Sequence, residues 1–170
     1  MIEGNNSASV TVMEVSPRDG LQNEELVFSP DQKLKLIKAA ISAGLERIEV
    51  VSFVNPKKVP QMANAENVCA GLTDIHEAKL TGLVLNERGY QRLRDTCLHE
   101  AGIVIASTDT FGIRNQGMDL MRGLDFAKSV LRDGQQTRFP VQVTFAVAFG
   151  CPFENSVPEA RILRMVEELV

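Results

Sequence analysis

Apolar positions along this chain follow two patterns in turn, and together they predict strands that alternate with helices. Runs rich in β-branched and other apolar residues are typical of strands, and they begin near residues 12, 47, 79, 103 and 141. Amphipathic segments with helical spacing follow them at residues 30–43, 62–70, 86–101, 119–132 and 158–170. The pattern therefore predicts five strand–helix units.

The first helix has the clearest boundary signals. Ser29 and Gln32 are placed to form a capping box, and Pro30 occupies the first helical position. Gly44 supplies a typical C-terminal stop. Polar segments at residues 52–60, 107–118 and 150–155 are expected to be loops.

Strand–helix repeats of this kind demand parallel strands joined by right-handed crossovers. Two α/β folds meet that demand. A doubly wound sheet is complete with five strands, whereas a (β/α)8 barrel needs eight units and about 250 residues. Periodicity alone favours the complete sheet, although the chain has neither a G-x-G-x-x-G sequence nor a Walker sequence to support nucleotide binding.

Composition narrows the class of protein. The 170 residues suit one domain, and a net charge of -4 gives no reason to expect a nucleic-acid partner. We expect no membrane span, because the longest apolar run is too short. Three widely spaced cysteines fit neither a disulfide framework nor a zinc site. Since residues 1–9 lack the features of a secretory signal, we expect a cytoplasmic protein.

The segment after the first predicted strand carries the first candidate chemistry. It breaks at Pro17 and presents Arg18 and Asp19 in a polar loop. Asp19 precedes a glycine, and Asp-Gly is a favoured turn pair, so a plain turn is one interpretation. The functional interpretation makes Asp19 an oxygen ligand for a hard cation and Arg18 a stabiliser of a developing oxyanion.

Glu49 strengthens the functional interpretation. It lies in the second predicted strand between apolar residues, where a carboxylate is costly unless it is paired. Arg18 or a metal-bound water is a plausible partner, and an ion pair with Arg47 or a lysine is the alternative. The carboxyl ends of neighbouring parallel strands share one edge of a sheet. We therefore expect Glu49 and the Arg18–Asp19 pair to form one site.

Other polar and aromatic residues carry weaker signals. Cys151 follows the fifth predicted strand, but a free cysteine is more often a small buried apolar residue than a nucleophile. Arg114 suits a phosphate, although solvated surface charge is the simpler interpretation. Phe153 is expected to anchor the core or a loop.

Four motifs in this order resemble the signatures of the 3-hydroxy-3-methylglutaryl-CoA lyase family. They are Ser16–Glu24, Ile48–Lys57, Val59–Met62 and Gly150–Glu154. The family belongs to the metal-dependent aldolase and Claisen-type enzymes built on a (β/α)8 TIM barrel. The resemblance therefore implies the first five β/α units of such a barrel, incomplete at the carboxyl end, in place of a complete sheet. Residues 1–170 would then be one partial barrel catalytic domain.

The resemblance also implies an activity and roles for three residues. The family cleaves 3-hydroxy-3-methylglutaryl-CoA, an acyl-CoA, to acetyl-CoA and acetoacetate with a divalent cation, Mg2+ or Mn2+. Asp19 matches the metal-ligand aspartate of the family. Arg18 matches the arginine that stabilises the enolate of the departing acetyl-CoA, and Glu49 matches an active-site acid that positions or relays protons.

Further residues match substrate-binding positions less completely. Gln22 matches a residue of the first loop that orients substrate. Arg114 and Asn115 fall near a Lys-Asn pair that contacts CoA, but Ser107–Thr110 departs from the usual form of that loop. Cys151 corresponds to a family cysteine other than the catalytic one.

The motifs for the remaining metal ligands and for the catalytic cysteine of the family do not occur in these residues. We therefore expect the 170 residues alone to be inactive, and we expect exposed strand edges to drive formation of a homo-oligomer. The alternatives are a related Claisen-type synthase, a 4-hydroxy-2-oxo acid aldolase, and a non-catalytic CoA-binding fragment.

Overall fold

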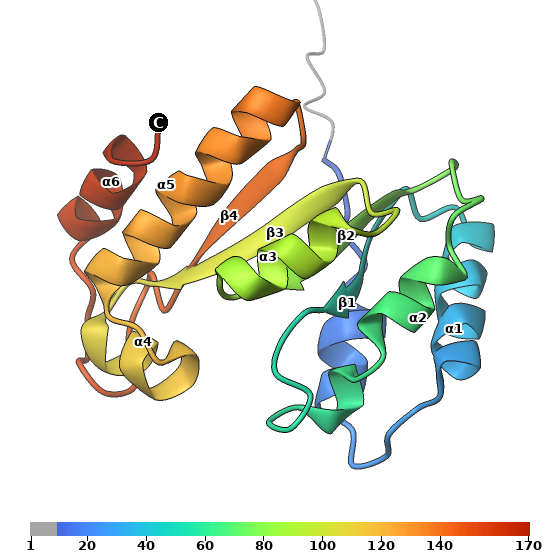
Figure 1. Ribbon diagram of the computed structural model, residues 1–170. Coiled ribbons are helices and arrows are strands. Elements are labelled where there is room, and N and C mark those ends of the chain that lie inside the picture. Colours follow the sequence, from blue (N-terminus) through green and yellow to red (C-terminus); the bar gives the residue numbers. More distant parts are fainter. Residues whose placement is uncertain (1–9) are drawn as a thin grey trace, which may run out of the picture.

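A computed structural model of the chain describes residues 10–170, and a parallel four-stranded sheet forms its centre (Figure 1). The strands are β1 (Arg47–Ser52), β2 (Lys79–Val84), β3 (Glu100–Ala106) and β4 (Val141–Ala146), and neighbours in the sheet follow chain order. The expectation about a targeting segment rests on residues 1–9, which lie outside the described residues.

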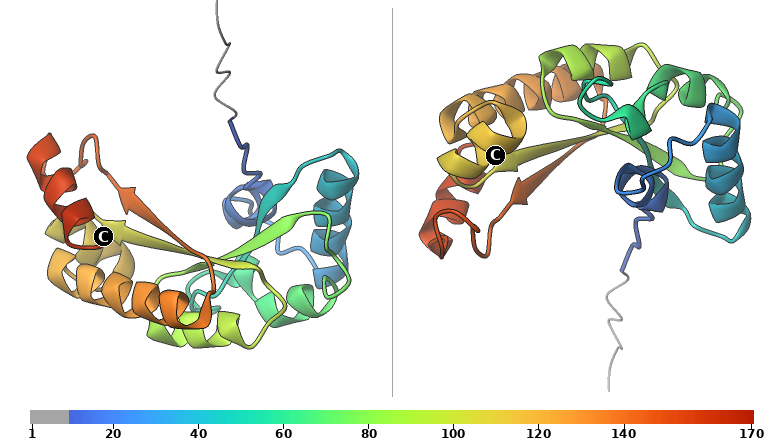
Figure 2. Two further views of the ribbon diagram at one scale, coloured as in Figure 1. Left: turned by 90° about the horizontal axis from the view of Figure 1, so that it is seen from above. Right: turned by 90° about the horizontal axis from the view of Figure 1, so that it is seen from below.

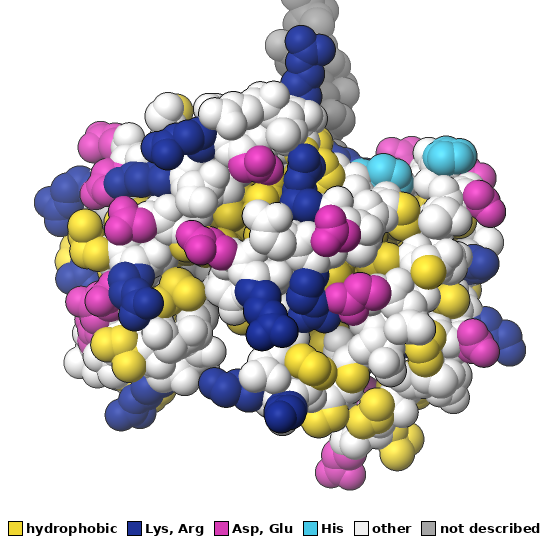
Figure 3. Space-filling model, in the orientation of Figure 1, with side chains coloured by type: hydrophobic (Ala, Val, Ile, Leu, Met, Phe, Trp, Pro, Cys, Tyr) yellow, Lys and Arg dark blue, Asp and Glu magenta, His cyan; other side chains and the backbone are white. Residues whose placement is uncertain are grey.

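Helices cover one side of this sheet. They are α1 (Pro30–Ser42), α2 (Ala65–Ala70), α3 (Glu87–Arg94), α4 (Asp109–Gln116), α5 (Leu120–Thr137) and α6 (Glu159–Glu167). They form an arc around the outer, convex side of the curved sheet (Figure 2). Across these helices, Lys and Arg side chains are interspersed with Asp and Glu side chains (Figure 3). Within residues 10–170, none of the helices combines the length and the apolarity that a membrane crossing requires.

The capping signals of the first helix are confirmed. The Ser29 hydroxyl accepts the Gln32 N–H at 3.3 Å, and the Gln32 side chain accepts the Ser29 N–H at 2.9 Å. This capping box fixes the start of α1, and Gly44, with a φ of 89°, follows its end.

The strand predicted near residue 12 is reduced to a single bridge. Glu14 forms a parallel bridge with Ile48. The Glu14 N–H donates to the Arg47 carbonyl at 2.9 Å, and the Glu14 carbonyl accepts the Glu49 N–H at 2.8 Å. The Glu14 carboxylate then accepts the Ser16 N–H at 2.6 Å, and the chain turns into a short helix. The prediction of a longer first strand was therefore wrong, although its parallel pairing with β1 is present.

The loop predicted at residues 107–118 contains helix α4, so this prediction was also wrong. The Glu154 carboxylate accepts the Thr110 N–H at 2.9 Å near the start of α4. Gly117, with a φ of 73°, ends the helix. The polar residues and Gly117 of this segment had suggested a loop, but they form the start and the end of a helix.

Other helix boundaries also differ from the prediction. α3, predicted over residues 86–101, ends at Arg94, and the chain enters strand β3 at Glu100; α6 ends at Glu167. α5 extends from Leu120 to Thr137, beyond the predicted end at residue 132. α2 begins at Ala65, because residues 60–62 form a separate 3-10 turn.

The core lies between the outer face of the sheet and the helices. Ile48, Leu80 and Ile103 are fully buried on this face, and Ile37 of α1 and Leu93 of α3 are fully buried on the helices. Each fully buried side chain of this size stabilises the fold by roughly 1.5–3 kcal/mol through removal of apolar surface from water. The sheet is therefore held from its outer side.

The inner face of the sheet carries a polar cluster around Glu100. This residue is 3% exposed, and its carboxylate accepts hydrogen bonds from Arg47 at 2.7 Å and from the Thr81 hydroxyl at 2.8 Å. The Lys79 ammonium lies 3.2 Å away, and Gln142 accepts a hydrogen bond from Arg47 at 3.0 Å. The cluster joins all four strands near their amino ends.

This cluster sets the charge state of Glu100. Burial alone would raise its pKa, but hydrogen bonds from Arg47, Thr81 and Lys79 outweigh burial and hold the pKa below its usual value. Folding lowers the pKa of Glu100, so the charged carboxylate stabilises the folded state at pH values above the usual pKa of a glutamate. This stabilisation is lost as the pH falls through the lowered pKa of the folded state.

We predict that Glu100→Gln lowers the free energy of unfolding by about 2–3 kcal/mol at pH 7, because Arg47 and Lys79, both partly exposed, lose their buried counter-ion. Urea denaturation at pH 7 and at about pH 3 measures this effect, and the difference from wild type should shrink at the lower pH. Glu167→Gln on the exposed side of α6 is the control. An equal loss at both pH values would contradict the charge-based explanation.

Candidate active site

One turn of π-helix, Ser16–Gly20, positions the first candidate residues beside β1. Pro17 is buried at its start, and the Asp19 N–H donates to the Val15 carbonyl at 2.7 Å. Single π-helical turns are rare and occur frequently at functional sites. This turn follows the Glu14 bridge and packs against β1, so Arg18 meets side chains of the strand.

Arg18, Asp19 and Glu49 lie together, as the sequence predicted. The Arg18 Nε donates to Glu49 Oε1, and its Nη1 donates to Asp19 Oδ1 at 2.7 Å. The alternative partner for Glu49 is excluded, because Arg47 binds Glu100 instead. One guanidinium therefore holds two carboxylates beside β1.

The two carboxylates differ in exposure. The Glu49 side chain is 9% exposed, whereas the Asp19 side chain is 54% exposed. Burial raises the pKa of Glu49, the charge and hydrogen bond of Arg18 oppose this rise, and the charge of Asp19 adds to it; the net shift is upward. Glu49 is thus suited to hold a proton, and Asp19 is open to a ligand from solvent.

Gly102 makes room for the second oxygen of Glu49. A Cβ at Gly102 would lie 3.3 Å from Glu49 Oε2 and 3.4 Å from Thr81 Cγ2, on the inner face of β3. A side chain there would press on the carboxyl group. This residue was missed from sequence because it precedes the apolar run that begins at Ile103, whereas the strand itself begins at Glu100. A glycine within a strand is a signal for close approach.

Gln22 lies just after the π-helical turn, and its side-chain carbonyl is buried. This Oε1 has no hydrogen-bond partner among the described residues. Buried acceptors are normally paired, so an unpaired one in a polar segment indicates a place for an external donor. Its assignment as a substrate-orienting residue remains a prediction.

The described residues supply only part of a divalent-cation site. Asp19 offers an exposed carboxylate, but Arg18 engages one of its oxygens. No group of three or more His, Cys, Asp or Glu residues that could hold a metal occurs within residues 10–170. Mg2+ and Mn2+ need several oxygen ligands in fixed geometry, so these residues do not fit a complete site.

Arg114 and Asn115 form a second group, on α4. The guanidinium carbon of Arg114 lies 4.3 Å from the centre of the Phe153 ring. The Asn115 amide donates to the Phe111 carbonyl of its own helix at 3.0 Å. α4 follows β3, whereas the π-helical turn follows the Glu14 bridge and packs against β1, so the two groups lie beside different strands of the sheet.

Cys151 is a buried anchor. Its Sγ accepts hydrogen bonds from the Thr108 hydroxyl at 3.1 Å and from the Phe153 N–H at 3.4 Å. The thiol therefore joins the segment after β4 to the start of α4, which agrees with the expectation of a structural cysteine.

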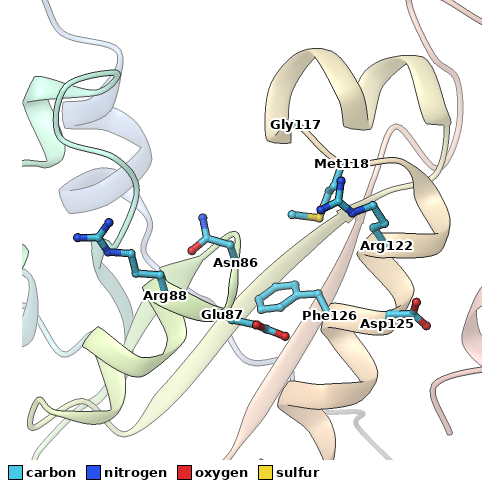
Figure 4. A pocket seen from close by; sticks show the side chains of 8 residues that line it. All are labelled: Asn86, Glu87, Arg88, Gly117, Met118, Arg122, Asp125 and Phe126. Atoms are coloured by element: carbon cyan, nitrogen blue, oxygen red, sulfur yellow. The ribbon is translucent and has the colours of Figure 1, made fainter.

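A hollow of 500 Å³ lies apart from these groups, between the start of α3 and the start of α5. Figure 4 shows the Phe126 ring between the two helices, while the Arg88 side chain points away from the other lining residues. Its charged residues include both arginines and acids, Glu87 and Asp125 among them. The hollow therefore offers no convergent set of groups for chemistry.

Comparison with known proteins identifies the relatives of this chain. A family model described as HMGL-like matches residues 9–170. A hydroxymethylglutaryl-CoA lyase of Bacillus subtilis is 32% identical over 94% of this chain and 54% of that protein. An (R)-citramalyl-CoA lyase of Chloroflexus aurantiacus is 35% identical over 95% of this chain and 54% of that protein. The chain thus spans about half the length of the curated relatives it matches.

Solved structures agree with this result. The structure of the Bacillus subtilis HMG-CoA lyase superposes with a TM-score of 0.88 at 32% identity, over 94% of this chain and 54% of that one. An HMG-CoA lyase of Acinetobacter baumannii, in complex with coenzyme A and 3-methylmalate, gives 0.87 at 32% identity, over 93% and 52%. The fold is therefore the first part of a (β/α)8 barrel, which confirms the partial-barrel prediction.

We predict that the Glu49 carboxyl group titrates above the usual range of glutamate side chains, because burial outweighs its ion pair. In Arg18→Gln its pKa should rise further, since the opposing charge and hydrogen bond are lost. Carbon-13 NMR of labelled glutamate side chains measures both values. Arg132→Gln, an exposed change on α5, is the control and should leave Glu49 unaffected. A fall in the pKa of Glu49 in Arg18→Gln would contradict the arrangement.

Proposed function

Because this chain belongs to the HMGL-like family, we propose that its Arg18–Asp19–Glu49 site serves a carbon–carbon lyase. The proposed reaction cleaves 3-hydroxy-3-methylglutaryl-CoA to acetyl-CoA and acetoacetate. The observation that carries the proposal is the arginine held between a buried and an exposed carboxylate beside β1 of a parallel sheet. Relatives named as lyases of acyl-CoA substrates support it.

Arg18 is proposed to stabilise the charge that develops during cleavage. The tertiary hydroxyl of the substrate loses its proton while the carbon–carbon bond breaks, and the electron pair moves into the enolate of the acetyl thioester. Arginine has five N–H donors, and Arg18 uses one on Glu49 and one on Asp19. The remaining donors are available to the enolate oxygen, and such preorganised donors commonly supply a large part of catalysis.

Glu49 is proposed to orient Arg18 and to hold a proton. Its Oε1 accepts from Arg18, so the oxygen left for a proton is Oε2, on the side of Gly102. The raised pKa favours the protonated form nearer to neutral pH than in an ordinary glutamate. A carboxyl group of this kind can exchange protons with the hydroxyl or with the enolate carbon of the substrate, directly or through water.

A divalent cation, Mg2+ or Mn2+, belongs to this proposal only through Asp19. When bound, such an ion supplies Lewis-acid polarisation of substrate oxygens. Asp19 would be one ligand. Since the described residues do not complete the coordination, we propose that the 170-residue chain by itself binds the ion weakly and does not turn over.

A second substrate deserves testing because the relative named (R)-citramalyl-CoA lyase is 35% identical. The roles proposed for Arg18 and Glu49 apply to any 3-hydroxyacyl thioester and do not distinguish one acyl group from another. Close 3-hydroxyacyl-CoA compounds therefore remain candidate substrates.

We also propose that the chain forms a homo-oligomer through its uncovered ends. Among residues 10–170, β4 pairs with β3 alone. The side chains of Phe149, which follows β4, and of Val170, which follows α6, are fully exposed. At the opposite edge of the sheet, Val12 lies next to the isolated Glu14 bridge and is 66% exposed. Exposed apolar groups and an unpaired strand edge favour association.

We predict that the 3-hydroxy-3-methylglutaryl group contacts Arg18 and Glu49. Titration of the wild-type chain with 3-hydroxy-3-methylglutaryl-pantetheine should shift the NMR signals of Arg18 Nε and the Glu49 carboxyl, and pantetheine alone should not. Arg18→Gln should weaken binding of the acylated compound by about tenfold, as expected for loss of a charge-assisted hydrogen bond. Arg132→Gln is the matched control.

Equal shifts with both compounds, or none, would refute this role of the site. Citramalyl-pantetheine and a 4-hydroxy-2-oxo acid, tested in the same way, separate the alternative substrates. In the presence of Mn2+ we expect no acetoacetate release from the chain, and clear release would show that the described residues suffice.

We predict that size-exclusion chromatography with light scattering finds species larger than the 18.7 kDa monomer. Phe149→Ser should shift the distribution toward the monomer, since it removes an exposed apolar side chain near the β4 edge. Arg132→Gln on the helical side should not. A monodisperse wild-type monomer would count against the oligomer.

A further inference from the structure

The segment after β4 is fastened to the start of α4. Cys151 and Asn155 exchange backbone hydrogen bonds of 2.7 and 2.9 Å, which closes residues 151–155 into a compact loop. From this loop, Cys151 Sγ accepts the Thr108 hydroxyl at 3.1 Å, and Glu154 accepts the Thr110 N–H at 2.9 Å. The loop and α4 are thus joined at two points.

Phe153 reaches from this loop to the exposed side of α4. Its ring centre lies 6.3 Å from the ring of Phe111 and 4.3 Å from the guanidinium carbon of Arg114. The ring remains 43% exposed. A cation over an aromatic face within this distance is attracted to it. Phe153 is therefore a platform that restricts where the Arg114 side chain lies.

The Arg114 guanidinium keeps its hydrogen-bond donors free. Arg114 is exposed and forms no ion pair or side-chain hydrogen bond among residues 10–170. Glu154, the acid adjacent to Phe153, instead accepts from Thr110 and lies 3.8 Å from Arg161. An aromatic ring attracts a guanidinium through its face and leaves the N–H groups of the arginine unbonded. A carboxylate partner would instead accept hydrogen bonds from those N–H groups. A fixed guanidinium with free N–H groups is suited to bidentate binding of phosphate.

We propose that Phe153 is a positioning residue that holds Arg114 for the phosphates at the nucleotide end of a CoA thioester. This inference rests on the proposed function and extends it to the opposite end of the substrate. Phe153 acts through Arg114 and does not contact the reacting atoms, because Glu49 lies in β1 and Arg18 in the turn packed against it, whereas Arg114 lies on α4, which follows β3. Its effect should therefore be confined to binding of the nucleotide end.

Isothermal titration with 3′-phosphoadenosine 5′-diphosphate, the nucleotide end of CoA, tests the inference on the 170-residue chain. Arg114→Gln should lower the affinity by about tenfold, as expected for a lost charge-assisted contact. Phe153→Leu should lower it by about threefold, as expected for an exposed cation–π contact, whereas Phe153→Tyr should preserve it. In an Arg114→Gln background, Phe153→Leu should cause no further loss.

Binding of 3-hydroxy-3-methylglutaryl-pantetheine, which lacks the nucleotide, should be the same in all of these variants. That comparison separates this inference from the lyase proposal, which depends on the acyl end at Arg18 and Glu49. The inference is overturned if the wild type does not bind the nucleotide, or if Phe153→Leu binds it as the wild type does. It is also overturned if the Phe153→Leu loss persists without Arg114, or if Phe153→Tyr is as damaging as Phe153→Leu. Circular dichroism of each variant confirms that it is folded.

Discussion

The ion pair between Arg18 and the buried Glu49 is the interaction on which the candidate site depends. A carboxylate with this little exposure is unfavourable without a partner, and Arg18 is the only cation bonded to it among the described residues. The same bond fixes the guanidinium, which would otherwise be free to rotate away from the strand. Each group therefore holds the other in place, and Asp19 meets the arginine from its exposed side. The site is therefore formed by the π-helical turn Ser16–Gly20 packed against β1.

The two faces of the sheet pack differently, and this difference supports the site. Its outer face is apolar and held by helices, whereas its inner face carries Glu49 in β1 and Glu100 at the amino end of β3. The Glu100 cluster ties the strands together through fully bonded charges. One oxygen of Glu49 accepts a hydrogen bond from Arg18, and the other lies beside Gly102, which has no side chain to press on it. Two buried glutamates on one face thus have opposite pKa shifts, because one is surrounded by donors and the other is mainly desolvated.

Much of the site was predictable from sequence because burial makes a charged residue conspicuous. Glu49 among apolar neighbours required a partner, and the shared edge of parallel strands pointed to Arg18. The length of the first strand was not predictable, since it depends on the Glu14 carboxylate turning the chain at Ser16. Helix α4 escaped prediction because the cap on Thr110 comes from Glu154, 44 residues later. The Glu100 cluster depends on register, which places Thr81 beside Glu100 and which local patterns do not encode. Which roles Gln22, Arg114 and Asn115 have in binding stays a prediction.

A double-mutant cycle on the free energy of unfolding tests the central claim most directly. Arg18→Met and Glu49→Gln, alone and combined, report the coupling between the two side chains, and Arg18→Met with Asp19→Asn gives the exposed pair for comparison. A buried pair that fixes the site should show a coupling of about 1–3 kcal/mol, while the exposed pair should show less than about 1 kcal/mol. A coupling near zero between Arg18 and Glu49 would contradict the account.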